Sequence, residues 1–150
     1  MPDITIEEVT EFSDELAETI ERLLPALSST AVYNVEVVKA IVASDATHLY
    51  LARLDGRIVG AASLVVYPIP TGIRAHIDDV VVDESARGHG LSRLLLNHLI
   101  DEANARFHVR TIDLTSRPDR EAANHLYQTS GFVQRNTNVY RWQSKPPAEQ

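Results

Sequence analysis

An apolar strand that leads through a loop and two glycines into a helix constrains this chain more than any other feature. Residues 77–82 predict a buried strand, and residues 83–89 form a loop that leads into a helix beginning near Leu91. The first N–H groups of a helix have no partner inside it and carry the positive end of its dipole. Glycine lets a bulky anion approach that backbone closely. Gly88 and Gly90 therefore predict a cradle for a pyrophosphate.

The glycine spacing separates this loop from two other phosphate-binding motifs. It contains no Gly-Lys-Ser or Gly-Lys-Thr, which a Walker loop requires. The order Gly88, Gly90, Ser92 also differs from the Gly-x-Gly-x-x-Gly of dinucleotide-binding proteins. The plain alternative is a helix N-terminus that merely contains two glycines, and the glycines alone support both interpretations equally.

Helical spacing of apolar residues predicts several helices. Ser13 and Asn34 can cap the first two, and Pro25 is expected to end the first of them. The helix after the glycine loop is expected to bury one apolar face, made of Leu91, Leu94, Leu95, Leu99 and Ala103. A last helix over residues 119–129 is expected to end at Ser130-Gly131.

Alternating and β-branched runs predict the strands. The expected strands cover residues 4–9, 48–54, 57–66, 75–82 and 109–115, with one or two short closing strands within 132–133 and 139–142. Asp55-Gly56 predicts a hairpin turn, and Pro68 and Pro70 should end the strand before them. The order β-α-α-β-β-β-α-β-α-β-β predicts an α/β (α+β) fold, a mixed and mostly antiparallel sheet with a central β-α-β crossover and helices on both faces. The last helix and the closing strands should extend one edge of that sheet.

Length and composition exclude several classes of protein. The 150 residues predict one domain over residues 1–150, with residues 143–150 as a frayed tail. With no cysteine, the chain can hold no disulfide, thiolate metal site or cysteine nucleophile, and it fits a reducing compartment. The histidines show no metal-ligand spacing, so no metal is expected. A formal net charge of −7 disfavours nucleic acid as a partner. No apolar run is long enough for a membrane helix and the acidic start is no signal peptide, so we expect a cytoplasmic protein.

Two motifs resemble the signatures of the GNAT superfamily of acyl-CoA-dependent N-acyltransferases. Arg87-Gly88-His89-Gly90-Leu91-Ser92 resembles the family's Gln/Arg-x-x-Gly-x-Gly/Ala, with Ser92 departing from the last position. Downstream, residues 123–132 resemble the family's Ala-x-x-Leu-Tyr-x-x-x-Gly-Phe segment. The strand Asp78-Asp79-Val80-Val81-Val82 is similar to that of some small-molecule members, including glucosamine-phosphate acetyltransferases. The resemblance covers residues 2–142 and implies a GNAT-like fold with acetyl-CoA as co-substrate.

The resemblance also implies a part in binding acetyl-CoA for each motif. The backbone of the strand pairs with the pantetheine arm, the glycine loop takes the pyrophosphate, and one face of the last helix meets the pantetheine and its sulfur. The residues so implied are Val80, Val81, Val82, Arg87, Gly88, His89, Gly90, Leu91, Ser92, Arg120, Asn124 and Tyr127. At about 100° per residue, Arg120, Asn124 and Tyr127 share one face of a helix.

Direct transfer to an amine needs an acid for the leaving thiolate and a base for the amine. The resemblance implies that Tyr127 protonates the thiolate, and a phenol with a pKa of about 10 is suited to do so. The alternative is a tyrosine packed in the core. An ammonium has no lone pair, so Asp78 or Asp79 is expected to take its proton, directly or through water. Successive strand residues point to opposite faces, so we favour Asp78 as the base and expect Asp79 to make a structural hydrogen bond.

Two functions of different classes follow. The first is an N-acetyltransferase that moves acetyl from acetyl-CoA to a primary amine of a small molecule or peptide in a ternary complex, because a chain without cysteine cannot form a cysteinyl acyl-enzyme. The alternative is a non-catalytic acyl-CoA-binding regulatory module. The acceptor pocket is expected among the loops at 25–33, 67–72 and 135–141. The acceptor, the acyl-chain preference and the oligomeric state, a homodimer included, stay open.

Overall fold

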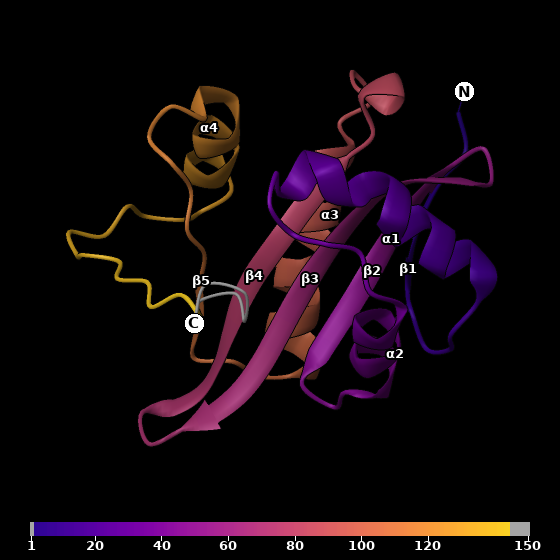
Figure 1. Cartoon of the computed structure of the whole chain (residues 1–150). Coiled ribbons are helices and arrows are strands. Elements are labelled where there is room, and N and C mark those ends of the chain that lie inside the picture. Colours follow the sequence, from indigo (N-terminus) through magenta and orange to yellow (C-terminus); the bar gives the residue numbers. More distant parts are fainter. Residues whose placement is uncertain (1, 145–150) are drawn as a thin grey trace. The chain divides into compact units, whose positions relative to one another are not determined.

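The computed structural model describes residues 2–144, which form two compact units, residues 2–117 and 118–144. The N-terminal unit contains β1 (Ile4–Glu8), α1 (Asp14–Leu27), α2 (Val35–Ala43), β2 (Thr47–Leu54), β3 (Arg57–Ile69), β4 (Gly72–Val82), the 3-10 helix η1 (Glu84–Ala86), α3 (Leu91–Asp101), the π-helical turn η2 (Glu102–Arg106) and β5 (Thr111–Asp113) (Figure 1). The C-terminal unit contains α4 (Glu121–Thr129). Each unit is described by itself.

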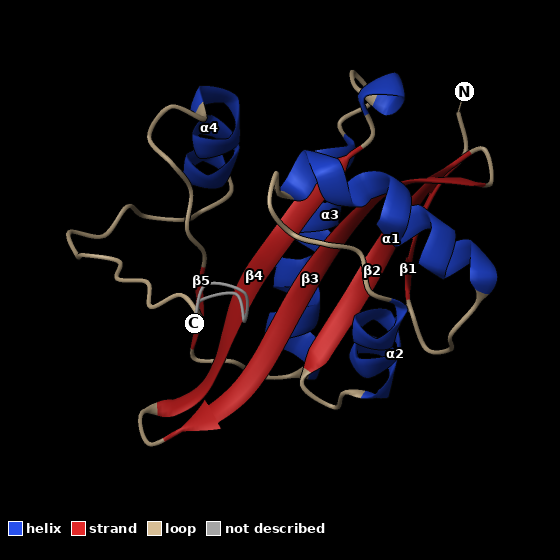
Figure 2. Ribbon diagram, viewed as in Figure 1, coloured by secondary structure: helices blue, strands red, loops and turns tan. Residues whose placement is uncertain are grey.

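The N-terminal unit is built on a five-stranded sheet in the order β1-β2-β3-β4-β5 (Figure 2). Neighbouring strands are antiparallel from β1 to β4, and β4 and β5 are parallel and joined by α3. Helices α1 and α2 cover one face of this sheet and α3 the other (Figure 1). The predicted mixed sheet, crossover and helices on both faces are therefore confirmed.

Side chains cap the first two helices as the sequence predicts. The Ser13 hydroxyl accepts the N–H of Leu16, and the Asn34 side chain accepts the N–H of Glu36. The prediction that Pro25 ends the first helix is wrong, because α1 continues to Leu27. A proline removes only its own backbone N–H. The hydrogen bond that closes the last turn of α1, from the Ser28 N–H to the Leu24 carbonyl, still forms at 3.0 Å.

Tight hairpins join the central strands. Asp55 (φ 51°) and Gly56 (φ 86°) both take positive φ, as the predicted two-residue turn requires. The prediction that Pro68 ends the next strand is wrong, because β3 runs to Ile69. The ladder with β2 stops at Val65, while the ladder with β4 continues through Pro68. Proline is tolerated there because that end of β3 has an unpaired edge.

The core lies on both faces of the sheet. On one face, Leu16, Leu23 and Val38 of the first two helices pack against strand residues that include Leu51 and Val81. On α3 the buried residues are Leu91, Leu95, Leu96 and Leu99, followed by Ala103 of η2. The predicted face was wrong at one position, because Leu94 is 42% exposed and Leu96 is fully buried. Which leucines a leucine-rich helix buries depends on how the helix is rotated about its axis against the elements it packs on.

The predicted closing strands do not form within the described residues. Residues 132–144 contain no strand, and Val133, Val139, Tyr140 and Trp142 are each at least 72% exposed. Gly131, with a positive φ of 97°, ends α4 as predicted. The short apolar runs after it indicated strands, but a strand also needs a partner that no local pattern specifies. The rest of the predicted tail, residues 145–150, lies outside the described residues.

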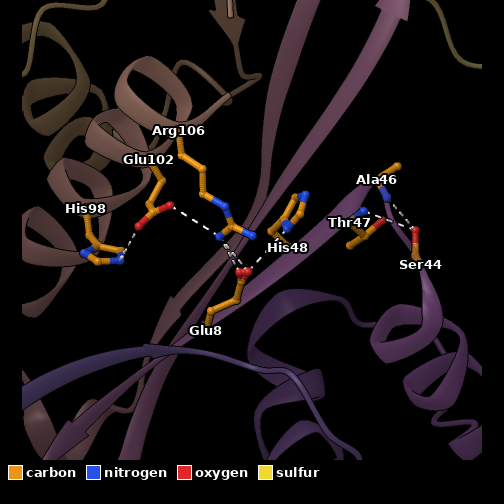
Figure 3. Close-up of polar contacts among 8 residues, drawn as sticks. All are labelled: Glu8, Ser44, Ala46, Thr47, His48, His98, Glu102 and Arg106. Atoms are coloured by element: carbon orange, nitrogen blue, oxygen red, sulfur yellow. Dashed lines mark hydrogen bonds and ion pairs between the residues drawn. The ribbon is translucent and has the colours of Figure 1, made fainter. Parts of the chain in front are cut away.

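A network of charged side chains ties the C-terminal end of α3 and η2 to β1 and β2 (Figure 3). Arg106 Nη1 lies 2.8 Å from Glu8 Oε2 and 3.5 Å from Glu102 Oε2. His98 Nε2 lies 3.8 Å from Glu102, and His48 Nδ1 lies 3.5 Å from Glu8. Burial pushes the pKa of Glu8 upward, but the hydrogen bonds and charge of Arg106, together with His48, outweigh burial and hold that pKa below its usual value.

This network predicts an acid-sensitive contribution to stability. A carboxyl whose pKa is lowered by folding stabilises the protein above its unfolded pKa, and that contribution disappears as the pH falls through the folded pKa. Arg106→Gln should therefore lower the free energy of unfolding by about 1 kcal/mol at pH 7. The loss should shrink as the pH falls below the ordinary pKa of 4.5 and vanish below the lowered pKa of folded Glu8, where that carboxyl is protonated. Denaturant unfolding of both proteins at several pH values measures this, and an equal loss at every pH would contradict it.

Candidate active site

The predicted cradle lies between the end of β4 and the start of α3. Asp83 accepts the N–H of Ser85 at 3.2 Å and begins η1, which turns the chain toward Gly88 and Gly90. Both glycines take positive φ, 89° and 70°, which other residues adopt only with strain. A Cβ atom on either glycine would meet no heavy atom within 4 Å. No side chain therefore covers the backbone at these two glycines, so a ligand can approach it closely.

The N-terminus of α3 differs from those of α1 and α2. Ser13 and Asn34 cap the first two helices, whereas Gly90 stands at the start of α3 and offers no side-chain hydrogen bond. The first turn of α3 also contains no acidic residue. Its N–H groups are therefore left for an external acceptor, and an anion suits them because the helix dipole is positive there. Leu91 is only 2% exposed, so it can contribute its backbone but not its side chain.

The strand before the cradle has a free edge. Strands β4 and β5 pair only between residues 74–76 and 111–113. Val80, Val81 and Val82 lie beyond this ladder, and no strand among the described residues pairs with them on the side away from β3. Backbone N–H and C=O groups on such an edge can pair with an extended ligand. The geometry suits the pantetheine contact that the resemblance implies for these three valines.

Asp78 and Asp79 lie at a β-bulge, which the sequence did not indicate. Ala61 pairs with Val81 and Ser63 pairs with Asp78, so a single residue of β3 faces both Asp79 and Val80. Asp79 has a positive φ of 54°. The extra residue breaks the alternation on which we based the prediction that the two carboxylates point to opposite faces. Both side chains are exposed.

The two carboxylates have different surroundings. Asp78 Oδ1 lies 3.5 Å from His76 Nε2. Although Asp79 is exposed overall, partial loss of hydration at its carboxyl, and then the negative charge of Asp78, raise the pKa of Asp79 above its usual value. Asp79 accepts no hydrogen bond from any described residue, so the predicted structural hydrogen bond is absent. A carboxylate with a raised pKa is a stronger base.

An open hollow of about 340 Å³ lies beside the strand end and the cradle. Three of the predicted cofactor residues line it: Val81, Val82 and Arg87. Three residues of α1 also line it: Arg22, Leu23 and Ala26. No motif in the sequence marks α1 as part of a binding site. The only available signal was the spacing of these residues, which places all three within little more than one helical turn.

In the C-terminal unit, α4 carries the remaining predicted residues. Asn124 and Tyr127 are half-buried, whereas Arg120 is exposed at the N-cap position. The Asn124 amide donates to the Pro118 carbonyl at 3.5 Å. The Tyr127 ring lies edge-on to Phe132, with ring centroids 6.1 Å apart. The helix thus places Asn124 and Tyr127 on one side, as the helical spacing predicts.

Residues 13–132 match the protein-family model described as "Acetyltransferase (GNAT) family". The chain belongs to the GNAT family. Members of the family use acetyl-CoA, and the cradle, the bare glycines and the free strand edge belong to the matched region.

Two curated relatives bear the names of acetyltransferases. A mycothiol acetyltransferase from Thermomonospora curvata is 36% identical over 107 residues, which are 69% of this chain and 33% of that protein. A glucosamine 6-phosphate N-acetyltransferase from Trypanosoma brucei brucei is 41% identical over 80 residues, 51% of this chain and 54% of that protein. This GNAT chain therefore matches between a third and somewhat more than half of the length of these curated relatives.

Solved structures of acetyltransferases share the fold. One from Agrobacterium tumefaciens is 23% identical with a TM-score of 0.80, covering 91% of this chain and 99% of its own. A ribosomal-protein-alanine N-acetyltransferase from Brucella melitensis is 20% identical with a TM-score of 0.74, covering 95% and 100%. At these identities the likeness establishes the GNAT fold.

Residues 2–144 contain neither a metal-binding cluster nor a membrane-spanning helix. Within that range no group of three or more His, Asp or Glu side chains could hold a metal ion. No helix in the same described part is long and apolar enough to span a membrane.

Proposed function

We propose that the chain transfers an acetyl group from acetyl-CoA to a primary amine, by direct attack in a ternary complex. One observation carries the proposal: a GNAT chain has bare glycines at an uncapped helix N-terminus, directly after a strand with a free edge. Such a backbone suits a diphosphate and the amide groups of a pantetheine arm.

The residues that would hold acetyl-CoA follow from these positions. The N–H groups from Gly88 to Ser92 face the diphosphate, and Arg87 adds a positive charge. The backbone of Val80, Val81 and Val82 pairs with the pantetheine arm, and Asn124 of α4 contributes a further polar contact, with Arg120 beside it. When bound, acetyl-CoA supplies an activated acetyl group on a thioester.

The chain's own side chains would move the protons. Asp79 takes a proton from the ammonium of the acceptor, which frees the nitrogen lone pair for attack. The negative charge of Asp78, which lies beside His76, raises the pKa of Asp79 and so strengthens Asp79 as a base. The Tyr127 hydroxyl gives a proton to the departing sulfur. A base whose pKa is raised toward the working pH combines ionisation with useful basicity.

The acceptor in this proposal is a small-molecule amine. Two of the relatives bear names that refer to mycothiol and to glucosamine 6-phosphate, which supports a polar metabolite over a protein terminus. We also propose a cytoplasmic location, which the lack of cysteine suits.

Turnover with amines separates this function from a non-catalytic acyl-CoA-binding module. The protein is incubated with acetyl-CoA and a panel of amines that includes glucosamine 6-phosphate, and released thiol is measured. We expect amine-dependent thiol release for at least one class of acceptor. CoA binding without amine-dependent release across the panel would favour the binding module.

The roles of the two aspartates predict different mutant behaviour. Asp79→Asn should lower kcat/KM about 100-fold, with recovery at high pH where the free amine needs no base. It should not lower the free energy of unfolding at pH 7. A raised pKa means that folding favours the protonated carboxyl, so above its folded pKa the ionised Asp79 disfavours the fold.

Asp78→Asn is the matched control. It keeps the size of the side chain beside His76 and should lower the rate less than Asp79→Asn does. Paired pH–rate profiles and denaturation curves decide. If Asp78→Asn is the inactive variant, Asp78 is the base, and if neither variant loses rate, no carboxylate on this strand is.

A further inference from the structure

A guanidinium from α1 stands at the end of β4, next to the cradle. Arg22 Nη1 donates to the Asp83 carboxylate, and Arg22 Nη2 donates to the Ile58 carbonyl at 2.9 Å. The side chain of Arg22 is nevertheless 44% exposed. A guanidinium has five N–H donors, so these contacts leave donors of Arg22 open to a ligand.

Arg22 belongs to the wall of two adjacent hollows. One, of about 350 Å³, is lined by residues that include Thr19, Arg57 and Ser85. The other, of about 340 Å³, is lined by Val81, Val82 and Arg87. Arg22 and Asp83 line both. A ligand held by the strand end and by Arg87 would thus have Arg22 within the same hollow.

If Asp83 releases Arg22, the Asp83 carboxylate still has other partners. Its carboxylate also accepts the N–H of Ser85 at 3.2 Å and lies 3.9 Å from Arg57 Nη2. A buried carboxylate left alone is unfavourable, but Asp83 keeps a hydrogen bond and a neighbouring cation if Arg22 turns away. Arg22 can therefore exchange the Asp83 carboxylate for an anionic ligand without leaving Asp83 unpaired.

We propose that Arg22 binds a phosphate of CoA, exchanging the Asp83 carboxylate for the ligand. This inference rests on the proposed function, because it takes the hollow beside β4 as the CoA site. The ligand chemistry is a phosphate ester, which a planar guanidinium binds through two parallel hydrogen bonds. Arg22 adds a second cation to Arg87 and closes the site from the side of α1.

The exchange predicts opposite effects at its two partners. Arg22→Gln should weaken CoA binding about tenfold to a hundredfold, measured by calorimetry. Asp83→Asn should strengthen it, because Arg22 loses its competitor while asparagine still caps η1. If the ion pair serves only to hold the fold, Asp83→Asn weakens CoA binding, and that result overturns the proposal even where Arg22→Gln fails to fold.

Arg57→Gln is the matched control. Arg57 is also an arginine beside Asp83, but it lines only the first hollow, so its CoA affinity should stay within about twofold of wild type. Titration with dephospho-CoA identifies the phosphate. An equal loss for both ligands in Arg22→Gln assigns the diphosphate, and a loss for CoA alone assigns the 3′-phosphate.

Two failures are distinguishable. If the wild-type protein binds neither CoA nor acetyl-CoA, the proposed function fails. If the wild type binds CoA and Arg22→Gln binds it equally well, or if Arg57→Gln loses as much as Arg22→Gln, the function stands and the assignment of Arg22 is wrong.

Discussion

Gly90→Val should abolish CoA binding. The structure leaves open space where a Cβ of residue 90 would stand, and a diphosphate at the start of α3 would need that space. The isopropyl group would keep the ligand from the first-turn N–H groups, and we expect affinity to fall about 100-fold or more, to the limit of calorimetric detection. Unchanged affinity would refute the cradle assignment.

The backbone of residue 90 calls for a matched control. Its φ of 70° makes valine strained there, which should lower stability by about 1–2 kcal/mol. Gly56, in the hairpin between β2 and β3, has a φ of 86° and equally open surroundings. Gly56→Val should therefore lose similar stability and keep wild-type affinity for CoA. An equal loss of affinity in both variants would mean that strain, and not the blocked cradle, causes it.

Tyr127→Phe should lower kcat by about 100-fold or more, the usual scale for a positioned acid. The substitution removes only the hydroxyl and keeps the ring that lies edge-on to Phe132. Acetyl-CoA affinity should change little, so the loss should appear in kcat and not in KM. Single-turnover and steady-state rates check this under conditions where the chemical step limits turnover.

Tyr50→Phe provides the control. Tyr50 lies in β2, is 1% exposed and belongs to none of the motifs or loops assigned to the site, so loss of its hydroxyl should leave kcat unchanged. Full turnover by Tyr127→Phe would make Tyr127 a packing residue, and the leaving thiolate would take its proton elsewhere.

The sequence correctly predicted those helix starts and turns that are formed by contacts between residues close together in the chain. Ser13 and Asn34 cap their helices through side-chain oxygens two or three residues away, and Asp55-Gly56 makes its turn through its own φ angles. The same holds for the start of α3, where the glycines act through their backbone. The fold and the backbone conformation of the glycine loop were predictable because these signals are short-range.

Features that depend on a distant partner were not predictable. Pro68 stays within β3 because β2 has already ended on one side of it. The apolar residues near Trp142 indicated a strand, yet residues 132–144 have no partner strand among the described residues. The ion pairs of Arg106 with Glu8 join residues 98 positions apart, and such contacts have no local signature.

The candidate site also combines features with local sequence signals and features that depend on distant partners. The valines before the cradle and the glycines in it were predicted as cofactor residues, and their backbone geometry suits that role. The bulge at Asp79 was missed, because its register is set by pairing with β3. Arg22 was missed because only folding brings α1 beside the end of β4.

The most direct test of the cradle is an NMR titration of the wild-type protein with CoA, in which backbone amide shifts are followed residue by residue. Binding as proposed should shift the amide signals of residues 88–92 most, followed by those of residues 80–82. All of these shifts should follow one saturable binding curve as CoA is added. A titration in which CoA binds but these amides stay unmoved, or in which no amide moves at all, would contradict the account.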